Sequence, residues 1–240
     1  MCRPEKPPNW RPVLLRGDGA ADLRPRGDRL YRAAALSLAT DDELTGCPGG
    51  LTWFDLRVDE ERARDRVRPL PPGWRIVSFP LAGADAAFDR RQAAASVAEI
   101  AAGRASWGSL YRAALTRAPA SFAGALRALA AIPGPVVIAC QGGRDRTGML
   151  VALLLALAGA SREQIVADYL RTNQDRSETQ RRQPPDGTLA APDLTCLASD
   201  IEDVLDLLDE FGGAHAYLGR VLPADEVTAI ARALRPRLLP

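Results

Sequence analysis

Short apolar runs separated by polar and proline-containing stretches mark the first half of the chain. Residues 51–57 (LTWFDLR) and 74–81 (WRIVSFPL) are rich in β-branched and aromatic residues, a composition that favours strands. Residues 29–36 (RLYRAAAL) predict a short strand that leads into a turn. The charged stretch DEERARDR, which follows residues 51–57, is typical of a helix with a solvated face. The stretch TDDEL, from Thr40 to Leu44, predicts a capped helix start, with Glu43 three residues after Thr40. The pattern therefore predicts strands connected by helical segments.

The second half of the chain is mostly helical in character. Residues 84–132 are rich in helix formers, with breaks near Gly103 and Pro119. After the breaker IPGP, the run PVVIAC predicts one more buried strand, and an apolar helix follows from Gly148 to about Ala158. Further patterns predict a capped helix that starts at Ser161, a polar surface loop over 173–193 and amphipathic helices at the C-terminal end.

Strands that alternate with helices favour one α/β domain over residues 1–240, with a small, mostly parallel central sheet flanked by helices. Residues 1–12 contain four prolines and predict an irregular N-terminal arm. In parallel sheets, ligands bind beyond the carboxyl ends of the strands. Cys140 directly follows a predicted strand and therefore lies at such an end.

Composition narrows the possible partners. The chain has 240 residues, 47% hydrophobic and 25% charged, with a net charge of +1. This balance is ordinary for a globular protein and gives no argument for nucleic acid or an acidic membrane surface as a partner. Lys6 is the only lysine among 31 basic residues. The longest apolar run is too short for a bilayer, and no secretory signal is visible, so a cytoplasmic location is expected.

The cysteines and the single histidine restrict the chemistry further. The four cysteines show no C-x-x-C pair and no zinc-type clustering, and His215 is the only histidine. A two-histidine metalloprotease helix is therefore excluded, and nothing local supports a Cys-His protease. No metal and no cofactor are expected. A nucleophilic cysteine in this chain must be activated by dipoles and arginine.

The stretch CQGGRDRTG, from Cys140 to Gly148, carries the strongest chemical signal. A cysteine followed six positions later by Arg146 is weak evidence by itself in a chain so rich in arginine. The context is stronger, because Gly142 and Gly143 allow a tight turn that exposes backbone N–H groups to an anion. The following helix N-terminus favours both phosphate and a thiolate. A buried structural cysteine is the alternative interpretation of this residue.

The same stretch resembles the signature loop of cysteine-dependent tyrosine and dual-specificity phosphatases. It is most similar to the bacterial branch with the loop H-C-x-A-G-K-D-R-T-G, which includes mycobacterial secreted phosphatases acting on phosphotyrosine, phosphoserine/threonine and phosphoinositides. Further matches are LYRAAAL to L-Y-R-S-G-A-L, WFDLRVDEER to V-I-D-L-R-x-x-x-E, and IVADYLRTN to D-Y-L-x-T-N. The resemblance covers most of the chain and implies a single phosphatase-type domain with a helical lid over residues 84–130.

The resemblance implies a metal-independent phosphomonoesterase that forms a phosphocysteine on Cys140, with Arg146 gripping the phosphate. A phosphorylated protein or a phosphoinositide would be the substrate, and a second basic residue, Arg144, suits one with an extra phosphate. Asp145 is the first candidate for the general acid, before Asp55, Asp85 and Asp89. The remaining phosphate-binding or substrate-binding residues are expected to be Gln141, Gly142, Gly143, Arg144, Thr147, Gly148 and Asp55.

Two positions depart from the family pattern. Ala139 stands where relatives have a histidine that orders the loop and supports the thiolate. The N-terminal N-F-R-D-L-G-G pattern is barely recognisable in LLRGDGAA, where Arg16 and Asp18 could be remnants. These departures leave open a phosphate-binding pseudophosphatase with weak or no turnover. A rhodanese-like or arsenate-type thiol enzyme is a third interpretation, against which Thr147 and Gly148 count.

Overall fold

The computed structural model describes residues 6–15, 29–65, 69–81, 95–175, 179, 182 and 194–239. Its centre is a five-stranded sheet with the order β1-β2-β5-β3-β4. The strands are β1 (Arg11–Pro12), β2 (Leu30–Ala33), β3 (Thr52–Asp55), β4 (Arg75–Ser78) and β5 (Val136–Ala139). β2, β5, β3 and β4 are parallel, whereas β1 pairs antiparallel with β2. The α/β fold with a mostly parallel sheet is therefore confirmed.

The helices follow the strands in the predicted alternation. Their bounds are α1 (Asp41–Thr45), α2 (Asp59–Arg62), α4 (Trp107–Arg117), α5 (Pro119–Ala131), α6 (Asp145–Leu157), α7 (Arg162–Leu170), α9 (Ala198–Glu210), α10 (Ala214–Gly219) and α11 (Ala224–Leu234), with 3₁₀ turns η1 (Leu36–Leu38), η2 (Arg171–Asp175) and η3 (Arg235–Leu238). Thr40 and Ser161 cap α1 and α7 through the capping boxes that the sequence predicts. None of the helices in the described part of the chain has the length and apolar character needed to cross a membrane.

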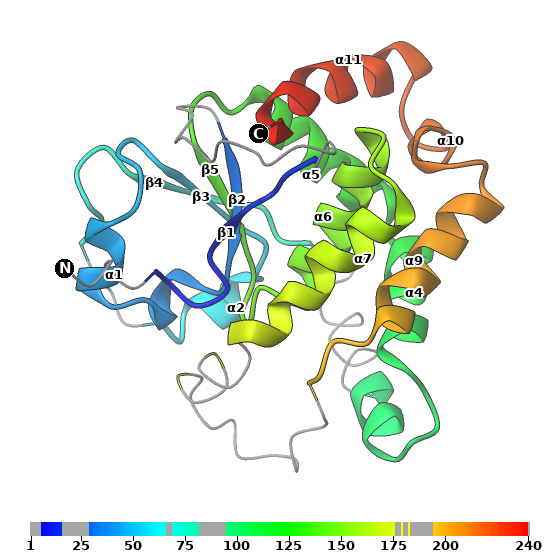
Figure 1. Ribbon diagram of the computed structural model, residues 1–240, viewed down its shortest axis with the longest axis horizontal. Coiled ribbons are helices and arrows are strands. Elements are labelled where there is room, and N and C mark those ends of the chain that lie inside the picture. The colour runs from blue at the N-terminus through cyan, green and yellow to red at the C-terminus, as the bar shows by residue number, and fades with distance from the viewer. Residues whose placement is uncertain are drawn as a thin grey trace.

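The two faces of the sheet are covered unequally (Figure 1). The larger core joins one face to α4, α5, α6, α7, α9, α10 and α11, and it contains Ile138 and Cys140. On the other face, Val137 and Ala139 belong to a smaller cluster with Tyr31, Trp53 and Trp74. This division follows from the alternation of side chains along a strand. Ala139 therefore faces the aromatic cluster, while Cys140 faces the helices.

The N-terminal arm differs from the irregular segment expected over residues 1–12. Within its described part, residues 6–12, β1 joins the sheet and Asn9 is 1% exposed. Trp10 stacks on Tyr31 with ring centroids 5.0 Å apart. Proline-rich composition hides this arrangement, because β1 is an edge strand of only two residues, where proline is tolerated. The arm is part of the folded core.

The segment expected to form a lid, residues 84–130, is only partly described. Residues 84–94 lie outside the described residues, whereas residues 95–101 are helical and α4 and α5 follow. α5 buries Phe122, Leu126 and Leu129 in the larger core. A lid therefore stays a prediction that concerns the part of the segment before α5. Of the predicted loop 173–193, only residues 173–175, 179 and 182 are described.

Candidate active site

The stretch CQGGRDRTG forms a loop between β5 and α6 at the carboxyl ends of the parallel strands. Cys140 follows β5 directly, and the neighbouring strands β2 and β3 end at Ala33 and Asp55, in register with Ala139. The N–H of Gly148 donates to Arg144 O at 2.7 Å and begins α6. In Figure 1 this edge of the sheet lies beside α2. The loop thus lies where parallel sheets bind their ligands.

Two glycines let the loop pack tightly against its surroundings. Gly143 has a φ of 65°, in the left-handed region, and a Cβ there would lie 2.4 Å from Ala33 O. At the start of α6, a Cβ on Gly148 would lie 3.0 Å from the ring of Tyr169. Side chains at these positions would displace the loop from β2 or the helix from α7. The glycines are therefore required by close approach at both ends of the turn.

Three consecutive carbonyls of the loop point outward to donors. Gln141 O accepts from Ala35 N at 3.0 Å. Asn9 Nδ2 donates to Gly142 O at 3.3 Å and to Gly143 O at 2.8 Å, and Arg32 Nη2 also donates to Gly143 O at 2.8 Å. In a trans peptide the N–H points opposite to the carbonyl. The following N–H groups therefore point into the loop, and within the described part of the chain they donate to no other group.

Cys140 and Thr147 stand near the two ends of this loop, and both are buried. Cys140 is 2% exposed and Thr147 is fully buried. The Thr147 hydroxyl has no hydrogen-bond partner in the described residues. An unsatisfied buried hydroxyl is costly unless a further group comes within reach. The cradle of N–H groups, the thiol and this hydroxyl form a site suited to an oxyanion.

Arg146, which lies near enough to Cys140 to interact with its charge, forms a bidentate ion pair with Glu61. Its Nη1 and Nη2 lie 2.5 and 2.7 Å from the two carboxylate oxygens, and about a quarter of each side chain is exposed. Although burial alone would raise the pKa of Glu61, the hydrogen bonds and charge of Arg146 lower it below its ordinary range. Glu61 is therefore an anion that orients the planar guanidinium of Arg146.

Arg144 and Asp145 form a second ion pair at the mouth of the loop. Arg144 Nε and Nη2 donate to Asp145 Oδ1 at 3.0 and 2.8 Å, and Tyr111 OH donates to the same oxygen at 2.6 Å. Burial would raise the pKa of Asp145, but the Arg144 charge and these hydrogen bonds lower it. Arg144 also lies 3.9 Å over the ring of Trp107, and its Nη1 has no hydrogen-bond partner in the described residues.

Asp55 belongs to a buried ion cluster beside the loop. Arg57 contacts both of its oxygens at 2.8 to 3.2 Å and also pairs with Asp65. Arg57 Nη1 further donates to Gln141 Oε1 at 3.0 Å. Through this contact the cluster holds the first residue after the nucleophile. The position of Asp55 thus fits a supporting role behind the loop better than contact with a leaving group.

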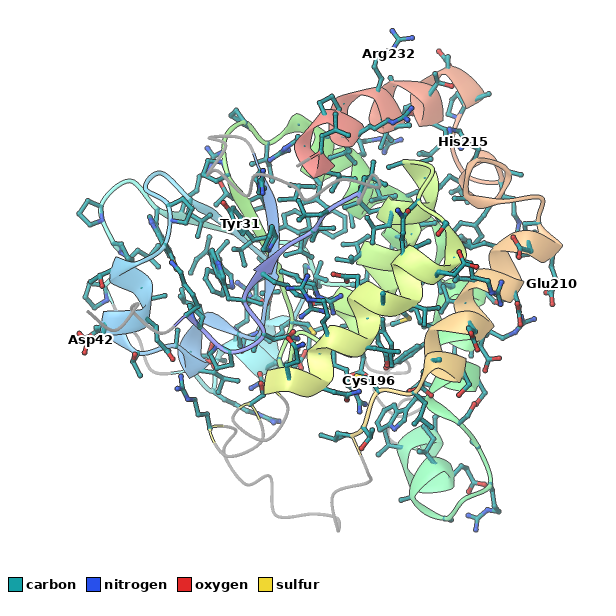
Figure 2. The ribbon with its side chains drawn as sticks, in the orientation of Figure 1. Tyr31, Asp42, Cys196, Glu210, His215 and Arg232 are labelled. Atoms are coloured by element: carbon teal, nitrogen blue, oxygen red, sulfur yellow. The ribbon has the colours of Figure 1, made fainter. Side chains whose placement is uncertain are left out.

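The other candidate residues lie elsewhere. Asp85, Asp89, Arg16 and Asp18 lie outside the described residues. His215 is exposed on α10, on the side of the molecule formed by α10 and α11 (Figure 2). Cys196, also labelled in Figure 2, is 2% exposed, and burial raises its pKa. Among the described residues, no group of three or more His, Cys, Asp or Glu side chains is placed to hold a metal ion.

Several residues of the site were missed by reasoning from the sequence. Arg11 and Arg32 share the carboxylate of Asp168, and Arg11 also donates to Asn9 Oδ1. The signal for Asn9 and Arg11 was present in the stretch Asn9-Trp10-Arg11, which matches N-F-R of the family pattern better than LLRGDGAA does. Arg32, Glu61 and Asp168 stand inside the quoted matches LYRAAAL, DLRVDEE and ADYLRTN without an assigned role. The matched segments converge on one loop.

Comparison with known proteins agrees with this geometry. The sequence model of the tyrosine phosphatase family matches residues 17–239. A curated relative, the triple specificity protein phosphatase PtpB of Mycobacterium tuberculosis, is 48% identical over 48 residues. That alignment covers 20% of this chain and spans only 17% of the relative's length.

Proposed function

Because the chain belongs to the tyrosine phosphatase family, we propose that it is a cysteine-dependent phosphomonoesterase. The observation that carries the proposal is the loop at Cys140, which combines inward N–H groups, a buried thiol and a Thr147 hydroxyl that has no hydrogen-bond partner among the described residues. Such a loop binds a phosphate dianion and places its phosphorus next to sulfur. No metal and no cofactor take part in the proposed reaction.

In the proposed first step, the Cys140 thiolate attacks phosphorus, the P–S bond forms and the P–O bond to the leaving group breaks. Arg146 donates to two phosphate oxygens and stabilises the charge of the transferring group. In the second step, water attacks the phosphocysteine, which releases inorganic phosphate and regenerates the thiolate. Thr147 donates to sulfur as it leaves. The side chain of Gln141, the glycines Gly142, Gly143 and Gly148, and Asp55 shape the loop around these atoms.

Asp145 is our candidate for the general acid. Its Oδ1 accepts all three hydrogen bonds from Tyr111 and Arg144, which leaves Oδ2 available to carry a proton to the leaving oxygen. Although burial would raise the pKa of Asp145, the charge of Arg144 and the hydrogen bonds from Arg144 and Tyr111 lower it. A phosphate dianion in the loop raises that pKa, since a second negative charge disfavours the carboxylate. Substrate binding would thus prepare the acid.

The proposed substrates are phosphotyrosine, phosphoserine or phosphothreonine in proteins, or a phosphoinositide. Arg144 supports the last class, because its Nη1 has no hydrogen-bond partner within the described ranges, although stacking on Trp107 and pairing with Asp145 restrain the side chain. Replacement of Arg144 by methionine should lower hydrolysis of a phosphoinositide more than that of a phosphotyrosine peptide. Equal losses on both substrates would argue against recognition of a second phosphate. A cytoplasmic location is part of the proposal, supported by Cys47, Cys140 and Cys196, which form no disulfide among the described residues.

The decisive experiment is hydrolysis of p-nitrophenyl phosphate by the wild type and by Cys140→Ser, with vanadate as inhibitor and EDTA as control. We expect turnover by the wild type that vanadate inhibits, that EDTA leaves unchanged and that Cys140→Ser abolishes. Equal rates for both proteins would refute the nucleophile assignment. Tight vanadate binding without turnover would instead support a phosphate-binding pseudophosphatase.

A further inference from the structure

Behind the loop lies a buried cluster that the catalytic scheme above does not use. It consists of Asn9 and Arg11 from the N-terminal arm, Arg32 from β2, and Asp168 and Thr172 from α7 and η2. Apart from Asp168, which is slightly exposed, all are at most 5% exposed. We call these five residues the arm cluster. Its contacts reach the loop backbone rather than the space in front of Cys140.

The arm cluster fixes the direction of two peptide units. Asn9 Nδ2 donates to Gly142 O and Gly143 O, and Arg32 Nη2 donates to Gly143 O. These carbonyls belong to the peptide units whose N–H groups are those of Gly143 and Arg144. Since the two ends of a trans peptide point apart, donors on the carbonyl side turn both N–H groups into the cradle. The distance of 2.8 Å between Asn9 Nδ2 and a Cβ built on Gly143 shows how closely arm and loop fit.

Asn9 is itself held in place. Its φ of 60° lies in the left-handed region, which asparagine tolerates better than most residues. Its Oδ1 accepts from Arg11, which in turn donates to Asp168 Oδ1 at 3.3 Å, Asp168 O at 2.7 Å and Thr172 Oγ1 at 3.1 Å. The amide orientation of Asn9 is therefore set, with its nitrogen toward the loop.

The arm cluster also contains more positive than negative charge. Arg11 and Arg32 share the single carboxylate of Asp168. The other ions around the loop are already paired, as Arg144 with Asp145, Arg146 with Glu61, and Arg57 with Asp55 and Asp65. Burial and the charge of Arg32 lower the pKa of Arg11 to about 9, so both disfavour the charged form of Arg11. A nearby anion has the opposite effect and favours the charged form of Arg11.

We propose that the arm cluster positions the oxyanion-binding loop and stabilises the Cys140 thiolate and bound phosphate, the task that the histidine before the nucleophile performs in relatives. The proposal rests on the proposed function, because it assumes that Cys140 reacts as a thiolate. Asn9, Arg11, Arg32 and Asp168 act through the loop backbone and are positioning residues. Ala139 cannot supply this support, since its methyl side chain carries neither a hydrogen-bond donor nor a charge.

Two substitutions separate positioning from charge. Asn9→Asp keeps the shape and the tolerance of a left-handed backbone but replaces the donor to two carbonyls by a carboxylate. Arg11→Met removes one charge while keeping an apolar side chain of similar length. Arg127→Met is the matched control, because Arg127 pairs with Glu226 on exposed α5 and α11 surfaces. Thermal unfolding and near-UV circular dichroism establish that each variant is folded.

The readout is the alkylation rate of Cys140 by iodoacetamide from pH 5 to 9, followed by mass spectrometry of its peptide, together with inhibition by vanadate. Cys47 and Cys196 are slow competitors, because burial raises the pKa of each thiol. We expect folded Asn9→Asp and Arg11→Met to be alkylated more slowly at pH 7 and to bind vanadate about tenfold more weakly or worse, because Asn9→Asp loses two neutral hydrogen bonds to the loop and Arg11→Met loses charged ones. Arg127→Met should match the wild type.

Unchanged alkylation and vanadate inhibition in a folded variant would overturn the proposal. If Asn9→Asp does not fold, Arg11→Met and the conservative Arg11→Lys decide, since the lysine keeps the charge and should restore most of the alkylation rate. A lysine variant no faster than the methionine variant would refute the charge effect. Failure of the proposed function looks different, because the wild type would then hydrolyse no p-nitrophenyl phosphate while its Cys140 still showed the Asn9- and Arg11-dependent reactivity.

Discussion

Replacement of Tyr111 by phenylalanine tests how Asp145 holds its proton. Tyr111 is fully buried in α4, and its hydroxyl donates to Asp145 Oδ1 at 2.6 Å and contacts Tyr169 OH at 3.0 Å. Burial and the Asp145 charge raise the pKa of Tyr111, so the phenol stays neutral and donates. A hydrogen bond given to a carboxylate stabilises its ionised form. Loss of that bond therefore raises the pKa of Asp145.

The size of the effect follows from the geometry. A hydrogen bond to a charged acceptor contributes about 1.5–3 kcal/mol, and about 1.4 kcal/mol corresponds to a factor of ten. The Asp145 side chain is 37% exposed and keeps its contacts with Arg144, so water replaces part of the lost bond. We therefore expect the low end of this range. At a pH where Asp145 is mostly ionised, its protonated fraction should rise by about tenfold in Tyr111→Phe.

The assay compares kcat against pH for an alkyl phosphate and for p-nitrophenyl phosphate. A general acid must be protonated, so a raised pKa of Asp145 moves the alkaline decline of kcat for the alkyl phosphate to higher pH. The nitrophenolate leaving group needs little protonation, and its profile should move little. Tyr217→Phe is the control, because Tyr217 is also fully buried and donates to Leu115 O at 2.8 Å, away from the loop.

A uniform drop of kcat at every pH, without movement of the alkaline limb, would refute this reasoning. The hydroxyl would then position Asp145 without setting its protonation. If the alkaline decline of kcat moved by the same amount in Tyr217→Phe, the effect would come from a general loosening of the helical core. Equal movement for both substrates would show that the titrating group is not the acid that protonates the leaving group.

Three further outcomes follow from the ion pairs and the packing. Glu61→Gln removes the charge that orients Arg146 and should raise KM for p-nitrophenyl phosphate and lower kcat, with about tenfold or greater loss of kcat/KM in steady-state kinetics; an unchanged kcat/KM would contradict the orienting role. The charges of Arg32 and Arg11 outweigh burial and lower the pKa of Asp168. Its ion pairs therefore stabilise the fold fully above the ordinary aspartate pKa of about 3.9, and this stabilisation is lost as pH falls through the lowered value. In urea unfolding, Asp168→Asn should be less stable than the wild type at pH 7, and the difference should shrink at low pH. Ala139→His should lower the melting temperature, because overpacking a fully buried site costs about 1–3 kcal/mol, and an unchanged melting temperature would show room for the ring.

Periodicity and capping signals were enough to predict most elements of this fold. The capping boxes at Thr40 and Ser161 form as predicted, because a hydroxyl followed three residues later by Glu43 or Gln164 satisfies helix N–H groups locally. The apolar run before Cys140 predicted β5, because a strand that is buried on both faces needs continuous hydrophobic residues. Local physical chemistry decides these features.

Long-range pairing could not be predicted from the pattern. The proline-rich composition before Val13 indicated an irregular arm, whereas Asn9 and Arg11 contact residues 134 and 157 positions away in the sequence. Likewise, nothing local in DEER shows that Glu61 contacts Arg146 rather than solvent. A charge run usually faces solvent, and only tertiary structure decides which of its members pairs with a buried guanidinium. Family matches pointed to these segments without giving the partners.

The alanine before the nucleophile can now be judged together with its surroundings. The adjacent strand end also differs from the family pattern, with Ala33-Ala34 in place of S-G, and these two alanines and Ala139 are fully buried. The region around Ala139 is therefore tightly packed, and no space is left where the histidine side chain of relatives would lie. Meanwhile the arm cluster keeps two buried arginines on one carboxylate, an arrangement that burdens stability, since a buried cation without its own partner is costly. This excess of positive charge is useful to a protein that binds an anion in the adjoining loop. It therefore favours a loop that binds phosphate over a loop that is kept only for the stability of the fold.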